Sequence, residues 1–183
     1  KEVLTKHKLT IAQIIILLAF VCGIGGFVYT YFPIYLHEYF TIHLVTGWSL
    51  QISIDILIMV CLLLSGILSD RLGRKKLPII ASVFFLLFSY PLLRLLSPGQ
   101  WHIAVIVLVL FATALSMHAG PLPALIVQLA PRRVRYTVFA LGYNIAFSIF
   151  AGSSPLVCAL LAKISPLAPA FYFMILAVLS LIV

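Results

Sequence analysis

Charged side chains are scarce in this chain: they make up 9% of its 183 residues, and only four of them are acidic. Soluble domains usually carry about 25% charged residues. Hydrophobic residues make up 64% of the chain, and the mean hydropathy is +1.23. The composition therefore excludes an ordinary soluble domain and predicts an integral membrane protein.

Metal-binding and thiol motifs are also lacking. The three cysteines lie inside apolar runs, with no C-x-x-C pair and no His/Cys spacing of a metal site. His37, Glu38 and His43 form H-E-x₄-H rather than the H-E-x-x-H of zinc hydrolases. We expect no metal, no cofactor and no enzymatic activity. The net charge of +8 is not a nucleic-acid footprint either, because the cations lie in the gaps between apolar runs.

Six apolar runs are long enough to be read as membrane-spanning helices, which need roughly 20 residues. None shows the alternation of a transmembrane barrel strand, so the predicted fold is all-α. The expected spans are residues 9–36, 45–69, 77–96, 102–130, 136–162 and 167–183. The last has 17 residues, about 25 Å of helix, which is marginal against a core of about 30 Å. Because there is also no initiator Met and no signal-peptide pattern, we expect the chain to be an excerpt of a longer one.

The cations predict an orientation. Ten lie at one end of the predicted spans: Lys1, Lys6, Lys8, Arg71, Arg74, Lys75, Lys76, Arg132, Arg133 and Arg135. Only Arg94 and Lys163 lie at the other. Loops on the cytoplasmic side carry the excess of Lys and Arg. The N-terminus of the segment is therefore expected in the cytoplasm, in a cell membrane, with the lipid bilayer as its surroundings.

The turn after the second span, GILSDRLGRKK at residues 66–76, concentrates charge between two apolar runs. Asp70 at the edge of the membrane is costly unless it is paired, and Arg71, Arg74 or the N-terminus of another helix could pair with it. Gly66 permits close helix approach, and Gly73 permits a tight turn.

Asp55 is the only acidic residue inside a predicted span. It precedes Asp70 by 15 residues, about 22 Å along a helix, and Gln51 lies one turn earlier on the same face. Ionisable groups inside membranes mark solute pathways or proton relays. The alternatives are a structural ion pair or hydrogen bond, with Arg94 or a tyrosine for example, or a protonated Asp55.

Two further spans carry candidate polar faces. In the fifth, Thr137, Asn144, Ser148 and Gly152 share one helical face, on which a buried Asn144 could contact a solute or join helices. Gly152 and Pro155 predict a bend there. In the first, Tyr29 could form part of an aromatic cage around a quaternary ammonium or belong to an interfacial belt. For Tyr31 and Tyr35 the belt is preferred.

His118 lies in the middle of the fourth span, just before a Gly-Pro-x-Pro break that suggests a hinge. A membrane histidine could relay protons. A neutral, hydrogen-bonded core histidine is the preferred interpretation. Arg94 lies close enough to the surface to extend its guanidinium to the headgroups.

The loop pattern Gly66-x-x-x-Asp70-Arg71-x-Gly73-Arg74-Lys75 resembles the signature loop of the major facilitator superfamily. Two further series, Pro131-x-x-x-Arg135-Tyr136 and Gly142-Tyr143-Asn144 followed by Gly152-Ser153-Ser154-Pro155, are similar to the C-terminal half of the metabolite:proton symporters. Phe32-Pro33-x-Tyr35-Leu36 is also similar to a helix of those carriers. Proline/betaine, α-ketoglutarate and citrate carriers belong to that family.

The resemblance implies that residues 1–183 form the C-terminal six-helix half of a major-facilitator fold. It implies alternating-access symport of a small polar metabolite with protons, and a gating loop that acts against an absent N-terminal half. Candidate pathway residues are Asp55, Gln51, Asn144, Tyr143, Tyr29 and His118. The alternatives are a stand-alone six-span unit, acting as a homodimeric half-transporter or pore, and an intramembrane protease. The protease is disfavoured because the chain lacks a G-x-S-G motif.

Overall fold

The computed structural model describes residues 8–130 and 134–183, and within these ranges all regular structure is helical. Among these described residues, five continuous helical stretches are long and apolar enough to cross a membrane, and a shorter apolar helix follows them. The elements are α2 (Lys8–Gly26), η1 (Phe27–Tyr31), α3 (Phe32–Phe40), α4 (Leu44–Leu72), α5 (Lys76–Leu95), α6 (Trp101–Ala119), α7 (Leu122–Leu129), α8 (Arg135–Ala146), η2 (Phe147–Ala151), α9 (Gly152–Ile164) and α10 (Ala168–Ile182). The predicted all-α membrane fold is confirmed.

Five of the six predicted runs agree with the observed helices to within about three residues at each end. The first run is the exception, because it continues to Phe40 instead of ending at Leu36. The predicted break in the fourth run is present, since α6 ends at Ala119 and α7 begins at Leu122, on the far side of Gly120-Pro121. A proline has no N–H to donate, so Pro121 and Pro123 cannot complete the helical ladder there.

Two long helices contain a π-helical turn, and each turn lies shortly before a proline. The η1 turn precedes Pro33, and the η2 turn precedes Pro155. A proline inside a helix removes one hydrogen bond and crowds the carbonyl four residues earlier. A π turn adds one residue locally and is a common way for a helix to absorb such a disturbance. In the fifth span, where Gly152 and Pro155 predict a bend, the structure has a π turn immediately before Gly152.

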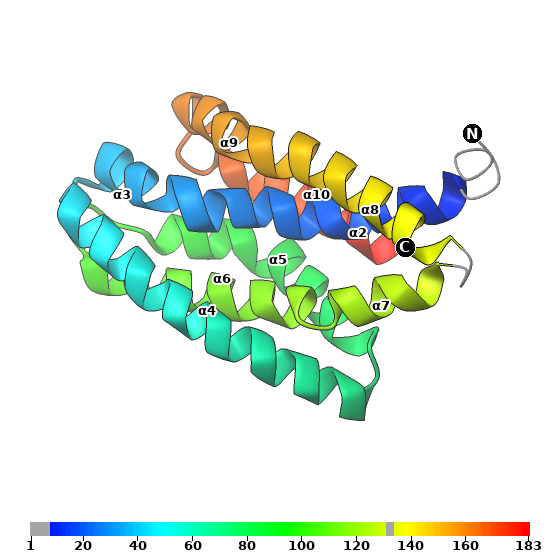
Figure 1. The fold of residues 1–183 in the computed structure, drawn as a ribbon. Helices are drawn as coiled ribbons and strands as arrows, with labels where there is room; N and C mark the ends of the chain where they lie inside the picture. The colour runs from blue at the N-terminus through cyan, green and yellow to red at the C-terminus, as the bar shows by residue number, and fades with distance from the viewer. Residues whose placement is uncertain (1–7, 131–133) are drawn as a thin grey trace.

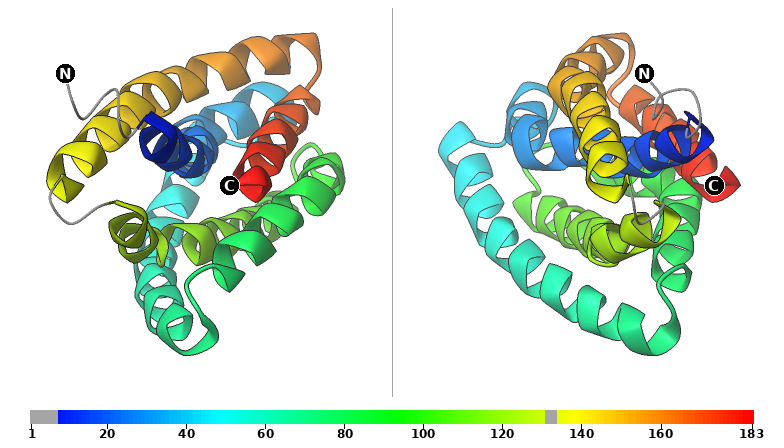
Figure 2. Two further views of the ribbon diagram at one scale, coloured as in Figure 1. Left: turned by 90° about the vertical axis from the view of Figure 1, so that its right-hand side faces the viewer. Right: turned by 45° about the vertical axis from the view of Figure 1, so that its right-hand side comes forward.

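The helices form a curved arrangement that leaves one side uncovered. At one edge α8–α9 packs against α2, and α2 packs against α10. Next, α10 packs against α5, α5 against α6, and α6 against α4 at the opposite edge. In both views of Figure 2, α4 and α8–α9 lie at opposite edges of the molecule, with α2, α6 and α7 between them. In Figure 1, α2 and α8–α9 run side by side in the same direction.

Burial differs sharply between the helices. In its most apolar stretch, α2–α3 is 67% buried, whereas α4 and α8–α9 are each 22% buried. The core is rich in fully buried aromatic rings, and Phe27 contacts Tyr35 and Phe173 edge-on with centroids 5.4 and 5.0 Å away. Such edge-to-face contacts are favourable beyond the area that they bury. The central helix α2–α3 is therefore mostly buried, whereas α4 and α8–α9, which we call the two flanks, are mostly exposed.

Gly120 allows α4 and the end of α6 to approach each other closely. A Cβ there would lie 2.9 Å from the Leu62 carbonyl oxygen and 3.1 Å from the Gly66 nitrogen, and it would also collide with Ser65. The absence of a side chain therefore lets α6 meet α4 at the backbone, as small residues do in membrane proteins. Gly66 lies at this crossing as predicted, but a Cβ on it would be 4.0 Å from Gly120, so Gly120 makes the tighter contact.

Candidate solute pathway

Gln51 and Asp55 form a hydrogen-bonded pair on α4. The Gln51 side-chain nitrogen donates to Asp55 Oδ1 at 2.9 Å. Gln51 is 2% exposed, whereas Asp55 is exposed. The side-chain oxygen of Gln51 is buried and has no partner among the described residues. The predicted stripe is present, and within the described ranges the predicted alternative of an Asp55–Arg94 ion pair is not formed.

The tyrosines of the first span divide into two groups. Tyr29 is 38% exposed, packs over Gly25, and lies within electrostatic range of Asp55. Tyr31 and Tyr35 are 5% and 0% exposed. The preferred interfacial belt is therefore wrong for these two rings, which point into the aromatic core.

The reason is that both hydroxyls find partners inside the protein. Tyr35 donates to the Pro166 carbonyl at 2.6 Å, and Tyr31 contacts Glu38 at 3.4 Å. A buried tyrosine is stable when its hydroxyl is satisfied in this way.

The polar face of the fifth span lies on the open flank. Thr137, Asn144, Ser148 and Gly152 are all exposed, so the face is real, but the expectation that Asn144 is buried is wrong. Its amide nitrogen donates to the Ala140 carbonyl, one turn earlier in the same helix, at 2.7 Å. Among the described residues this amide therefore joins no helices, because its hydrogen bond stays within its own helix.

Tyr143 lies between two other rings on α8 and η2. Its centroid is 5.7 Å from that of Phe139 and 4.9 Å from that of Phe147, with the planes within 23° of parallel. These rings line a groove of about 170 Å³ beside Cys22 and the α6–α7 break. The groove is almost wholly apolar, so its walls suit the carbon skeleton of a solute better than its charge.

His118 is completely buried and joins three helices. Its Nε2 lies 2.9 Å from the Ser180 hydroxyl of α10, which accepts from Ser82 of α5 at 3.1 Å. The imidazole stacks on Phe20 with centroids 4.2 Å apart. The preferred interpretation of a hydrogen-bonded core histidine agrees with this geometry, although Nδ1 has no partner among the described residues.

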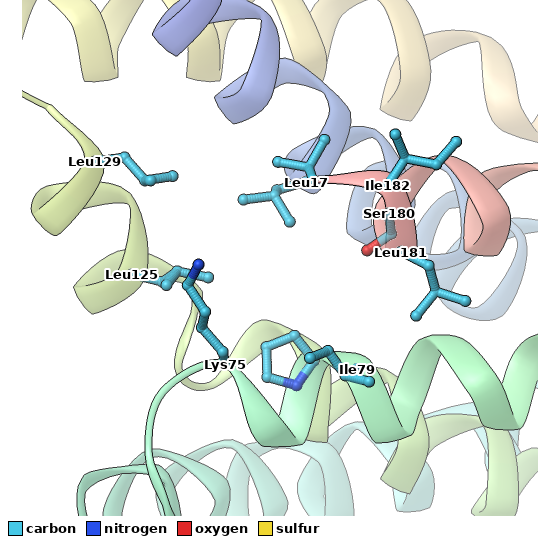
Figure 3. A pocket seen from close by; sticks show the side chains of 10 residues that line it. Leu17, Lys75, Ile79, Leu125, Leu129, Ser180, Leu181 and Ile182 are labelled. Atoms are coloured by element: carbon cyan, nitrogen blue, oxygen red, sulfur yellow. The ribbon is translucent and has the colours of Figure 1, made fainter.

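Ser180 also faces a cavity of about 230 Å³ at the end of the bundle where the charged loop lies. Figure 3 shows its hydroxyl and the Lys75 side chain on the wall of this cavity, among leucine and isoleucine side chains from α2, α5, α7 and α10. His118 is therefore one hydrogen bond from a cavity wall, but its own ring does not line the cavity.

The charged loop has the local geometry expected from its sequence. Asp70 pairs with Arg74, one of its predicted partners, at 3.4 Å, and the Asp70 side chain is 65% exposed. Gly73 has φ of +99°, a conformation that glycine adopts without strain. Arg71 and Lys75 are also exposed, so the loop presents charge to its surroundings.

The structure describes only part of the second basic cluster, which consists of Arg132, Arg133 and Arg135. Arg132 and Arg133 lie outside the described residues, and Arg135 begins α8. Arg135 is half-buried, and its Nε has no partner within residues 8–130 and 134–183.

The structure brings some candidates together and separates others. Asp55, Gln51 and Tyr29 form one group, and Tyr143 and Asn144 lie on the other flank. His118 belongs to neither group, because it is buried against Phe20 of α2 and Ser180 of α10. Sequence analysis missed the partners of His118, because single serines in apolar runs carry no periodic signal. It also missed the role of Gly120, whose Gly-Pro context pointed to a hinge and not to a helix crossing.

Comparison with known proteins agrees with this architecture. A model of the Major Facilitator Superfamily matches residues 1–155. A putative proline/betaine transporter of Staphylococcus aureus (strain COL) is 31% identical over 156 residues, which cover 84% of the chain and 33% of that protein. The proline/betaine transporter of Salmonella typhimurium is 28% identical over 186 residues, which cover 100% of the chain and 37% of that protein.

A glycine betaine/proline/ectoine/pipecolic acid transporter of Dickeya dadantii is also similar, at 31% identity over 157 residues, 84% of the chain and 31% of that protein. The chain spans about a third of the length of these relatives. No solved structure matches it significantly. The family match covers most of the chain, and the helices have the predicted all-α architecture, so the chain belongs to the major facilitator superfamily of membrane transporters.

Proposed function

We propose that residues 1–183 form the C-terminal six-helix half of a secondary transporter for small zwitterionic solutes of the proline and betaine type. The other half, or a second copy of this chain, covers the open side, and the solute passes between the two by alternating access. The names of the similar transporters support the substrate class. We place the protein in a bacterial inner membrane because the similar transporters are bacterial. The cation distribution supports a cytoplasmic position for the charged loop.

The observation that carries the proposal is how the polar groups of the flanks are bonded. Asp55 accepts from Gln51 and Asn144 donates to Ala140, each bond within one helix. The exposed Asp55 carboxylate and Asn144 amide keep further hydrogen-bonding capacity. Polar groups inside a membrane are costly unless they contact protein, water or solute. A central pathway between two halves provides such contacts.

Asp55 is the candidate for proton coupling in this part of the protein. A carboxylate within a span can bind a proton, and its charge then changes as the pathway opens to either side. Asp70 has a different proposed role. Its pairing with Arg74 is exposed, which leaves the carboxylate available to a helix of the other half in one state of the gate.

The test is uptake of L-proline and glycine betaine by membrane vesicles that contain the whole protein, measured at several external pH values. Wild-type protein should accumulate at least one of the two solutes faster at acidic external pH. Asp55→Asn should abolish accumulation or remove its pH dependence. The matched control is Ser53→Ala, an exposed position on the same helix whose hydroxyl bonds only the Ser49 carbonyl.

Either of two results would contradict the proposal. Absence of uptake of both solutes by wild-type vesicles would reject the substrate class. Unchanged uptake and unchanged pH dependence in Asp55→Asn would remove Asp55 from the coupling step.

A further inference from the structure

We propose that the groove between α2, the α6–α7 break and α8 is the subsite for the alkylated ammonium end of the solute, and that its affinity rises with the number of methyl groups on the nitrogen. The inference rests on the proposed function and adds the part of the pathway that distinguishes solutes within the proline and betaine class. The groove has a volume of about 170 Å³, and Phe139, Tyr143 and Phe147 form one of its walls.

The groove can be reached from outside the helices. Tyr143 and Phe147 are 37% and 47% exposed, and Phe139 is half-buried behind them. The remaining walls come from α2 and from both sides of the α6–α7 break. In Figure 2, α2, α6 and α7 lie between the two flanks, which places the groove beside the proposed pathway.

The walls offer few hydrogen-bonding groups. Among the described side chains that line the groove, only the Cys22 thiol and the Tyr143 hydroxyl are polar. An ammonium group with N–H bonds gives up hydrogen bonds to water when it enters such a groove and regains few, which is costly. A quaternary ammonium has no N–H bond to lose, because its surface consists of methyl groups. Proline, with two carbon substituents on its nitrogen, is intermediate.

Two features of the groove stabilise the positive charge that the methyl groups surround. Aromatic rings attract cations electrostatically, and quaternary ammonium groups are typical ligands of aromatic sites. Ala119, the last residue of α6, also lines the groove. Its carbonyl lacks the usual helical donor four residues later, because Pro123 has no N–H. The end of α6 is also the negative end of its dipole, so it complements the charge beside the rings.

The experiment is a methylation series on one carbon skeleton, in membrane vesicles that contain the whole protein. Glycine, N-methylglycine, N,N-dimethylglycine and glycine betaine carry an increasing number of methyl groups on the nitrogen. Each compound is used to inhibit uptake of radiolabelled L-proline or glycine betaine, whichever is transported, and its inhibition constant is measured. For the wild type we expect this constant to fall about fourfold with each methyl group, the scale of burying one carbon in an apolar site.

Two variants of an exposed ring test the aromatic wall. Phe147→Leu keeps an apolar side chain but removes the ring, so the inhibition constant of glycine betaine should rise at least about threefold while that of glycine changes little. Phe147→Tyr keeps the ring and should retain the wild-type series.

Phe171→Leu is the matched control, because Phe171 is also exposed but lies on α10, away from the side chains that line the groove. It should leave the whole series unchanged. If a variant transports too slowly, equilibrium binding of radiolabelled glycine betaine to the purified whole protein gives the same comparison.

Three outcomes would overturn the inference. Equal inhibition constants across the series in the wild type would show that the methyl groups do not enter an apolar site. An unchanged series in Phe147→Leu would show that they bind elsewhere. Equal weakening of all four compounds in Phe147→Leu would show that the ring contacts the other half or a lipid instead of the ammonium group. Absence of uptake of both L-proline and glycine betaine by the wild type would instead reject the proposed function itself.

Discussion

Buried polar groups at helix contacts and exposed polar groups of the flanks are bonded in different ways. The buried groups join helices: Ser65, on the buried face of α4, donates to the Ser116 carbonyl of α6 at 2.7 Å, and His118 meets Ser180. The exposed groups bond within one helix, as Asn144 does with Ala140 and Ser53 with Ser49. The buried groups have therefore used their hydrogen-bonding capacity on the fold, and the exposed ones keep capacity for other contacts.

This difference indicates which residues stabilise the fold and which are available for transport. A polar group that bridges two buried helices leaves an unsatisfied partner when it is removed, whereas a group bonded to its own exposed helix leaves a carbonyl that the solvent can reach. We expect substitutions in the interior to lower stability. Substitutions on the flanks should alter transport with little effect on stability.

The largest expected effect is at the α4–α6 crossing. Gly120 and Gly152 both have right-handed helical backbone angles, so alanine is compatible with either backbone. In Gly120→Ala the new methyl group collides with Ser65 and lies 2.9 Å from the Leu62 carbonyl oxygen. Overpacking of this kind costs about 1–3 kcal/mol. The free energy of unfolding in mixed micelles should fall by that amount.

Gly152→Ala is the matched control on the exposed flank, because a Cβ there meets nothing within 4 Å. Its stability should equal or slightly exceed that of the wild type, since alanine favours a helix more than glycine does. Equal destabilisation by the two substitutions would contradict the assignment of the crossing to Gly120.

The next effect concerns the buried cluster of His118, Ser82 and Ser180. Ser180→Ala removes the shared hydroxyl and leaves His118 Nε2 without its observed partner. An unsatisfied buried group costs about 1–3 kcal/mol, so unfolding should be easier by roughly that amount. Ser148→Ala, an exposed serine of the flank, should change stability by less than about 0.5 kcal/mol. A Ser180→Ala protein as stable as the wild type would show that the cluster does not stabilise the fold.

A smaller effect on stability is expected at the charged loop. Exposed ion pairs contribute about 0–1 kcal/mol, and Asp70 and Arg74 are 3.4 Å apart in an exposed position. Asp70→Asn should therefore leave unfolding nearly unchanged but slow uptake in vesicles that contain the whole protein. Arg74→Gln is the comparison. If the partner that Asp70 needs for gating lies on another helix, Arg74→Gln should slow uptake less than Asp70→Asn does. Equal uptake by Asp70→Asn and wild type would remove Asp70 from the gate.

The smallest effect on stability is expected at Asn144. Its amide bonds only the Ala140 carbonyl, so Asn144→Ala should change the free energy of unfolding by less than about 0.5 kcal/mol. The same substitution should raise the KM for solute uptake if this face lines the pathway. A large loss of stability would show that Asn144 makes a contact outside the described residues, and the flank would then resemble the interior.

The parts that sequence analysis predicted well are those with a strong local signal. Apolar length identified the helices, i,i+4 spacing placed Gln51 beside Asp55, and Arg74 was one of the three partners predicted for Asp70. Burial was predicted poorly. Asn144 was expected inside and is exposed, and Tyr31, expected at the membrane interface, is buried.

Those errors share a physical reason. In a membrane helix that is apolar on all sides, hydrophobic residues face lipid as readily as they face protein, so the amphipathic pattern that marks the core of a soluble helix is weak. Which face of α8 is covered depends on where α2 lies, and Gly142 packs closely against Ile14 there. The remainder of the helix surface, including Asn144, is left exposed.

The sequence by itself determined that this is a membrane protein, where its apolar helices lie and where its charges are, because hydropathy and helical spacing are properties of neighbouring residues. Only the tertiary structure decided that His118 is joined to Ser180, 62 residues away, and that the oxygen of Gln51 has no partner within residues 8–130 and 134–183. Contacts between distant helices depend on packing, which no local pattern encodes.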